Sequence, residues 1–258
     1  MSNKVLCLFV HYFDKASAFE GKSKYQLEEV RKEIVTRALG ALRSIRDVDV
    51  VVCGYKNSSL VGIDRDLSGV TSQPQHMMYE ALGQLAQFRN EYDYFMVIED
   101  DILVSPDMFN NVYGFDRRFG IDQIMLPNRI EIREDKVYCI DTRIIPGMTD
   151  DVIEFNRRKL AVHNNPHSGL LLVNRDKLDY LAGRVDASYR GKFIGGYMAS
   201  AFAHYHRPFR LYRVADGYDF HTVLHMDQYV VPKQSLAHRT KAAVARGLRP
   251  IRRLGRQS

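Results

Sequence analysis

Short apolar runs that alternate with amphipathic segments most constrain the fold of this chain. Residues 4–12, 49–53 and 94–98 are rich in apolar and β-branched side chains, as expected for strands buried on both faces. The segments between them, 22–45 and 74–89, repeat apolar residues at helical spacing. This order of strand, helix, strand, helix and strand predicts an α/β fold with a mixed, mostly parallel sheet flanked by helices.

The pattern becomes less regular after the third run, and we expect both strands and loops there. Residues 57–72, which are rich in Gly and Ser, are expected to form a loop, and 146–158 an irregular charged flap. The remaining segments predict a strand pair at 123–132 and 136–140, strands at 170–173 and 209–214, helices at 174–182 and 193–206, and a loop or short strand at 217–225.

Three consecutive acids, Glu99, Asp100 and Asp101, directly follow the third apolar run. Three carboxylates at the end of a buried strand repel one another and are costly to desolvate without a counter-charge. A hard divalent cation supplies that charge and prefers oxygen ligands, and ligands of open α/β sheets bind beyond the carboxyl ends of strands. The triplet therefore indicates a metal–phosphate site. The alternative is an acidic turn into a helix, with Asp107 in its first turn.

Composition is compatible with one domain and a sizeable core, since 45% of the 258 residues are hydrophobic. No apolar run approaches the roughly 20 residues that span a bilayer. The N-terminal residues have no small-residue cleavage site, so we expect a first strand there and not a signal peptide. Cys7 and Cys53 fall within predicted strands, which indicates core thiols in a reducing compartment.

The chain has neither a G-x-G-x-x-G fingerprint nor a phosphate-binding P-loop. With those absent, the layout and the acids resemble a glycosyltransferase of the GT-A fold. The stretch from Val97 to Phe109, with its acids, apolar pair, Pro-Asp and aromatic, looks most like the E-D-D region of the N-acetylglucosaminyltransferase I family. This local likeness covers about a dozen residues.

The resemblance implies roles for the residues that match. Asp101 would be a direct ligand of Mn²⁺ or Mg²⁺ and essential for catalysis, Glu99 would face the metal or the ribose, and Asp100 the sugar–diphosphate. His11, Tyr12 and Phe13 would hold the base and ribose of the nucleotide-sugar donor, or else simply pack at the end of the strand. Many GT-A enzymes add a late histidine at the metal, and here the choice lies between His221 and His225, with His225 preferred.

Four further residues are candidates for the site. His167 and Ser168 would contact the acceptor or the donor sugar, and Arg129 would meet the diphosphate unless it is a solvated arginine. In inverting GT-A enzymes a catalytic base usually starts a helix, but residues 191–197 contain no acid. The nearest acids are Asp186 upstream and Asp216 and Asp219 beyond; Asp216 is taken as the candidate catalytic carboxylate, and a retaining mechanism is favoured.

The C-terminal tail has a different character from the body of the chain. Residues 233–258 hold eight basic residues and no acid, so of the total charge of +6 residues 1–232 carry −2. Drawn as a helix, the tail sets arginines against an apolar stripe, which suits an anionic membrane surface. We therefore expect a catalytic domain at 1–232 and a basic amphipathic tail from Lys233 to Ser258. A solvated tail is the alternative, and no nucleic acid is expected as a partner.

The expected function is therefore transfer of a sugar from a nucleotide-diphosphate donor to a glycan or lipid-linked glycan. A UDP-sugar is the favoured donor. Bacterial surface polysaccharide or lipopolysaccharide synthesis, in the cytoplasm or at the inner face of the membrane, would suit such an enzyme. One alternative is a sugar-nucleotide pyrophosphorylase, but residues 11–14 lack the glycine-rich basic loop of that class. Another is a non-catalytic module that binds membranes or nucleic acid through its tail.

Overall fold

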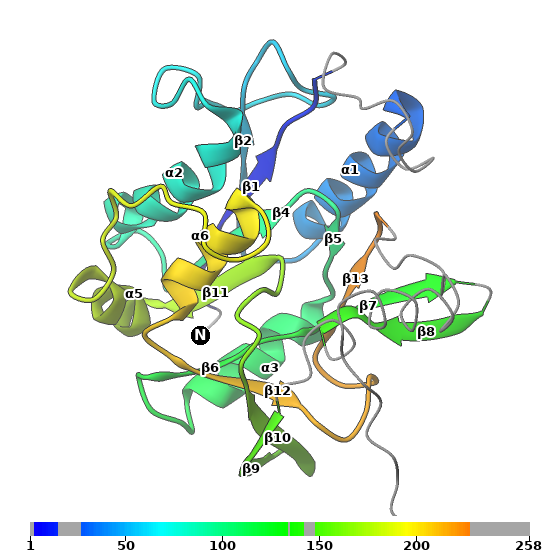
Figure 1. The fold of residues 1–258 in the computed structure, drawn as a ribbon, viewed down its shortest axis with the longest axis vertical. Helices are drawn as coiled ribbons and strands as arrows, with labels where there is room; N and C mark the ends of the chain where they lie inside the picture. Colours follow the sequence, from blue (N-terminus) through cyan, green and yellow to red (C-terminus); the bar gives the residue numbers. More distant parts are fainter. Residues whose placement is uncertain (1–2, 15–26, 134, 142–147, 228–258) are drawn as a thin grey trace, which may run out of the picture. The chain divides into compact units, whose positions relative to one another are not determined.

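The computed structural model describes residues 3–14, 27–133, 135–141 and 148–227, which belong to one compact unit that ends at Asp227. A five-stranded sheet forms its centre (Figure 1). Its strand order is β11 (Leu170–Asn174), β4 (Tyr94–Glu99), β1 (Val5–His11), β2 (Val48–Gly54) and β3 (Arg65–Asp66). The strands β4, β1, β2 and β3 run parallel and β11 is antiparallel to β4. The predicted α/β fold with a mostly parallel sheet is confirmed.

Helices cover both faces of this sheet, because β1 and β4 are buried along their whole lengths and need apolar partners on each side. On one face Leu6, Leu8 and Val97 pack with α2 (Met77–Gln84), α5 (Arg175–Ala182) and α6 (Tyr197–His206). On the other face Cys7, Phe9 and Met96 pack with α1 (Glu28–Arg43) and α3 (Pro106–Asp116). The central layer is thus fixed by the alternation of side chains along β1 and β4.

Two smaller sheets complete the unit. One has the order β6 (Gln123–Met125), β12 (Arg210–Val214), β10 (Arg158–His163) and β9 (Met148–Phe155). The other has the order β5 (Ile102–Leu103), β13 (Thr222–His225), β7 (Asn128–Arg133) and β8 (Lys136–Cys139). Short 3-10 turns at Pro74–His76 and Leu85–Phe88 flank α2. No helix in the described ranges is both long and apolar enough to cross a membrane.

Two predictions for the middle of the chain were wrong. The expected single strand at 123–132 is divided between β6 and β7, which belong to different sheets, because Pro127 has no N–H to continue a ladder. The expected flap at 146–158 is instead strand β9, paired with β10; residues 146 and 147 lie outside the described residues. Asn156 and Arg157, with φ of 51° and 62°, form the two-residue turn between β9 and β10.

The helix and strand boundaries differ from the predictions in smaller ways. Helix α1 runs over 28–43, and residues 22–26 of the predicted helix lie outside the described residues. The helix expected within 193–206, with its start near Gly195 and Gly196, is α6; it begins at Tyr197, because Gly195 has a φ of 52° that a helix does not allow. The predicted loop at 57–72 contains β3, and 217–225 contains β13. Helix α3 begins at Pro106, with Asp107 in its first turn, as the sequence predicts.

Candidate active site

Strand β4 delivers the three acids to the carboxyl end of the central sheet. Glu99 is its last residue, and Asp100 and Asp101 form the turn into β5. All three are buried, with exposed fractions of 6%, 6% and 7%. Such burial of adjacent carboxylates requires compensating partners, and each acid finds a different one.

Asp100 is held by two basic side chains. His11, at the end of β1, places its Nδ1 2.6 Å from one carboxylate oxygen, and Arg31 of α1 pairs with the other. The Nε2 of His11 accepts the backbone N–H of Leu60 at 2.9 Å, so Nδ1 carries the proton and donates it to Asp100. Burial raises the pKa of Asp100, but Arg31 and His11 outweigh it and leave that pKa below its ordinary value.

Asp101 faces His225 of β13. The Nε2 of His225 lies 3.6 Å from Asp101 Oδ2, while its Nδ1 lies 3.1 Å from Glu131 on the neighbouring strand β7. The backbone N–H of Met226 also donates to the Asp101 carbonyl, which fixes β13 against this turn. Within the described residues, Asp101 Oδ1 is buried without a hydrogen-bond partner.

Glu99 faces His167, whose Nε2 lies 3.6 Å from Glu99 Oε1. Burial, and then the charge of Asp101, raises the pKa of Glu99 to about 8. Burial and the nearby Arg129 lower the pKa of His167 well below its usual value, so the imidazole is neutral. The loop can approach this closely because Gly169 has a φ of 71° and a Cβ there would lie 2.8 Å from Ile102.

A fourth acid, Asp227, joins these three through Arg31, whose Nη1 lies 3.6 Å from Asp101 and 3.7 Å from Asp227. We call Glu99, Asp100, Asp101 and Asp227 the carboxylate cluster. In the part of the chain that the structure describes, no group of three or more His, Cys, Asp or Glu side chains forms a ready cage for a metal ion.

The available side chains nevertheless fit a divalent cation whose remaining coordination positions are filled by a diphosphate. Mg²⁺ is usually bound by one or two carboxylates together with substrate phosphates and water, and it does not need a full protein cage. Two protein ligands are present: the Asp101 carboxylate, whose Oδ1 has no hydrogen-bond partner among the described residues, and the imidazole of His225. Glu131 orients His225 in the way that carboxylates orient metal-binding histidines.

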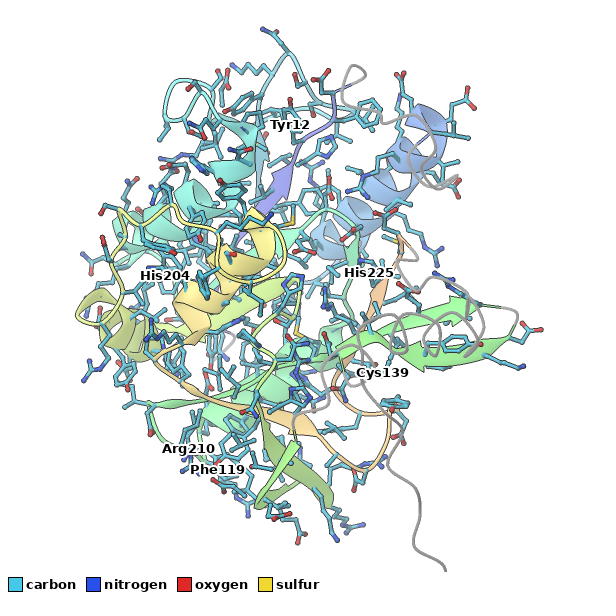
Figure 2. All side chains as sticks on the ribbon, in the orientation of Figure 1. Tyr12, Phe119, Cys139, His204, Arg210 and His225 are labelled. Carbon is cyan, nitrogen blue, oxygen red and sulfur yellow. The ribbon has the colours of Figure 1, made fainter. Side chains whose placement is uncertain are left out.

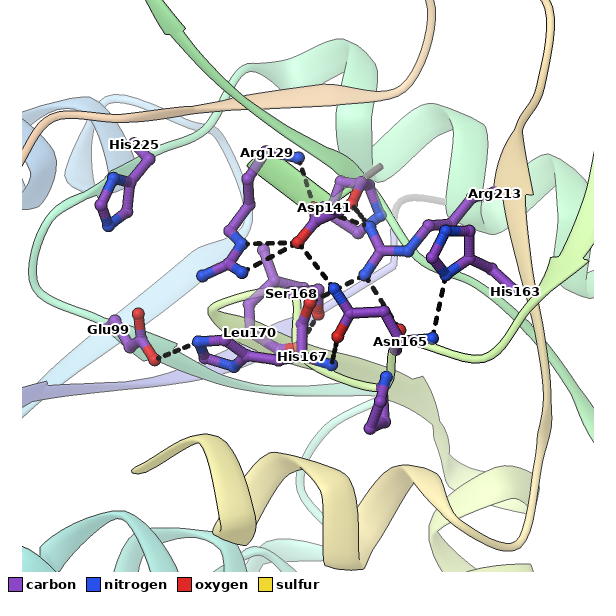
Figure 3. A network of polar contacts seen from close by, with 12 residues as sticks. Glu99, Arg129, Asp141, His163, Asn165, His167, Ser168, Leu170, Arg213 and His225 are labelled. Carbon is purple, nitrogen blue, oxygen red and sulfur yellow. Dashed lines mark hydrogen bonds and ion pairs between the residues drawn. The ribbon is translucent and has the colours of Figure 1, made fainter. Parts of the chain in front are cut away.

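A second buried cluster lies beside the first, around Asp141 (Figure 3). Arg129 reaches Asp141 Oδ1 at 2.8 Å and Arg213 reaches Oδ2 at 3.0 Å; we call these three residues the Asp141 cluster. Burial raises the pKa of Asp141, but the two guanidinium groups outweigh it and hold that pKa below its usual value. Arg213 also donates to the carbonyl of His167 at 2.8 Å and so ties the His167 loop to this cluster.

Arg129 is a buried residue and not a solvated one, since its side chain is only 7% exposed. Its guanidinium lies between Asp141 on one side and Glu99 and His167 on the other (Figure 3). Burial lowers the pKa of Arg129, but Asp141 and, to a smaller extent, Glu99 outweigh it and raise that pKa. It is therefore placed to meet an anion that enters beside the carboxylate cluster.

A cleft of about 450 Å³ opens next to Asp100. Its lining includes Tyr12, Arg31, Met77, Met78, Asp100 and Tyr197. Tyr12 follows β1 (Figure 2) and is half-buried, with its ring edge-on to Tyr55 at 5.7 Å. An aromatic and thioether wall with a charged end suits a flat base that is attached to an anionic group.

Other predicted residues lie elsewhere or use their polar groups locally. His221 contacts the Met125 carbonyl at 3.2 Å, so of the two late histidines it is His225 that meets the acids. Ser168 donates to the Leu170 carbonyl, and Phe13 is half-buried beside the loop at Ser58. Asp216 is exposed and accepts the backbone N–H of Lys159 at 3.2 Å.

Sequence reasoning missed the basic and acidic partners of the site. These are Arg31, Glu131, Asp141, Arg213 and Asp227. None of them belongs to a recognisable motif, and Arg31 stands in an ordinary charged stretch of helix. The one available signal was that buried carboxylates demand counter-charges, which does not say where in the chain those charges lie.

No protein-family model matches the chain, and no curated protein matches it. Solved structures give distant likenesses. S. aureus TarS is 9% identical with a TM-score of 0.44, over 86% of this chain and 60% of that one, so this chain spans less than two thirds of it. A197 from STIV is 11% identical with a TM-score of 0.39, over 90% of this chain and 99% of that one. A glycosyltransferase involved in glycosylation of the major capsid of PBCV-1 is 10% identical with a TM-score of 0.29, over 69% and 63%. At such scores these likenesses carry no argument about function.

Proposed function

We propose that this chain is a metal-dependent glycosyltransferase that uses a nucleotide-diphosphate sugar, with UDP-sugars as the first choice. The observation that carries the proposal is the buried carboxylate cluster at the carboxyl end of β4, with His225 at Asp101 and an aromatic-walled cleft at Asp100. Ligands of α/β sheets bind at this edge, and diphosphate-bound cations need few protein ligands.

In this proposal Asp101 and His225 hold Mn²⁺ or Mg²⁺, and Glu99 lies against the metal or the ribose. The bound metal would stabilise the negative charge that develops on the departing diphosphate. Tyr12 and Met78 flank the base in the cleft, and His11 acts by fixing Asp100. Arg129, held in place by Asp141, approaches the phosphates from the other side.

The bond from the anomeric carbon to the diphosphate oxygen breaks in this reaction, and a bond from that carbon to an acceptor hydroxyl oxygen forms. We favour retention at the anomeric carbon, because the first turn of α6 contains no acid that could take the acceptor's proton. His167 lies against Glu99, where it can position the acceptor or the transferred sugar.

The acceptor we propose is a glycan or a lipid-linked glycan, as in the synthesis of bacterial surface polysaccharide or lipopolysaccharide at the cytoplasmic face of the membrane. Residues 233–258, with their excess of arginine and lysine, would bind anionic lipid. Sedimentation with anionic vesicles tests this, and loss of binding after removal of residues 233–258 is expected.

A donor screen tests the enzymatic proposal. The full chain is incubated with UDP-, GDP- and CMP-sugars in Mn²⁺ and in EDTA, and release of the nucleotide is measured with and without acceptor glycans. We expect turnover with a UDP-sugar that EDTA abolishes. If no nucleotide raises the melting temperature with metal present, the proposal fails.

A further inference from the structure

Arg31 occupies the place in the carboxylate cluster where a positive charge is needed. It lies in the first turn of α1, and its guanidinium contacts Asp100 directly and lies within 3.7 Å of both Asp101 and Asp227. Its side chain is 15% exposed. One guanidinium thus compensates carboxylates from two separate segments, the turn after β4 and the residues after β13.

A divalent cation bound by the Asp101 carboxylate would lie close to the Arg31 guanidinium. Arg31 Nη1 and His225 Nε2 both lie 3.6 Å from the same atom, Asp101 Oδ2. A bound Mn²⁺ or Mg²⁺ lies at about 2.0–2.2 Å from its oxygen ligands, so its charge would face the guanidinium at close range. In a buried site such like charges repel strongly.

Arg31 also has an alternative partner within reach. Its side chain lines the cleft that contains Tyr12 and Asp100. A diphosphate in that cleft would offer the planar guanidinium two oxygens at once, which is the geometry in which arginine binds phosphate most strongly.

We infer that Arg31 is an internal counter-cation that exchanges partners: it holds Asp101 and Asp227 in the unliganded protein and passes to the donor diphosphate when a divalent cation takes its place. This inference rests on the proposed function. Because each ligand then removes an obstacle to the other, Mn²⁺ and UDP must bind with positive coupling, and the coupling is reciprocal.

The test compares Arg31→Gln with the wild type and with Arg37→Gln, which removes an exposed positive charge from the same helix. Binding of Mn²⁺ alone is measured by electron paramagnetic resonance, and binding of UDP by calorimetry with and without Mn²⁺. In R31Q we expect Mn²⁺ alone to bind about ten-fold more tightly and UDP to bind about ten-fold more weakly. The coupling between Mn²⁺ and UDP should be smaller than in the wild type, and what remains comes from direct contact between the metal and the diphosphate. R37Q should resemble the wild type.

The outcomes separate this inference from the proposed function. If the wild type binds neither Mn²⁺ nor UDP, the proposed function fails. If the wild type binds both but R31Q binds Mn²⁺ no more tightly, the exchange is overturned and the function stands. If R31Q is unfolded in metal-free buffer, Mn²⁺ should fold it by replacing the lost charge; a variant that stays unfolded in millimolar Mn²⁺ also overturns the exchange.

Discussion

The two buried charged clusters of this protein lie side by side but are balanced differently. The Asp141 cluster sets two guanidinium groups around one carboxylate, and both of its oxygens are bonded. The carboxylate cluster sets three acids, Asp100, Asp101 and Asp227, around Arg31, with Glu99 beside His167, and it leaves Asp101 Oδ1 without a hydrogen bond among the described residues. A buried carboxylate with both oxygens bonded supports the fold, whereas one with an unbonded oxygen beside further acids is suited to a ligand.

Breaking the Asp141 cluster should have the largest effect, and it should fall on stability. Asp141→Asn removes the counter-charge that two buried guanidinium groups share, so we expect a loss of about 3–5 kcal/mol in the free energy of unfolding. Chemical denaturation measures this. Asp135→Asn is the matched control, because Asp135 is exposed and asparagine tolerates its φ of 61°. A loss below about 1 kcal/mol would show that Asp141 is not essential to the fold.

Breaking the carboxylate cluster should instead affect activity. Asp101→Asn removes a metal ligand in the proposed mechanism, and we expect nucleotide release to fall about 100- to 1,000-fold. The free energy of unfolding should change by no more than about 1 kcal/mol, since one repelling charge disappears along with two long ion pairs. Asp107→Asn, an exposed position in α3, should behave as the wild type in both assays. Unchanged turnover in D101N would contradict the assignment.

The pH dependence of stability should distinguish the clusters further. The pKa of Glu99 is raised to about 8 in the folded protein, so between its unfolded value near 4.5 and pH 8 the folded state binds the extra proton. Stability therefore falls as pH rises through this window, and Glu99→Gln, which cannot ionise, should gain about 1–3 kcal/mol relative to the wild type. Denaturation in metal-free buffer from pH 5 to 8, with the exposed Glu154→Gln as control, measures the gain. A constant difference between E99Q and wild type would refute it.

The smallest effect is expected at Asp216, which lies outside both clusters. Its carboxylate is exposed. The one hydrogen bond described for it is the one it accepts from the backbone N–H of Lys159. We expect Asp216→Asn to change turnover less than about three-fold, as is usual at exposed positions. A steady-state assay of nucleotide release decides this, and a drop comparable with that of D101N would restore Asp216 as a catalytic carboxylate.

The sequence by itself determined the central strands, because runs such as 5–10 and 94–98 are apolar at every position and must be covered on both faces. It also placed the three acids at the carboxyl end of β4, since a residue that follows a strand directly has nowhere else to lie. It did not reveal the turn at Asn156 and Arg157, because only asparagine there favours a positive φ and no glycine marks the turn.

Only the tertiary structure decided which charges meet those acids. Arg31 lies about 70 positions before Asp101, and Glu131 lies 94 positions before His225. Nothing local to either residue distinguishes it from a solvated charge, because an ion pair depends on distance in space and leaves no periodicity in the chain. The sequence thus shows where negative charge is concentrated, while the packing of α1 and β13 against β5, which follows β4 directly, decides how that charge is compensated.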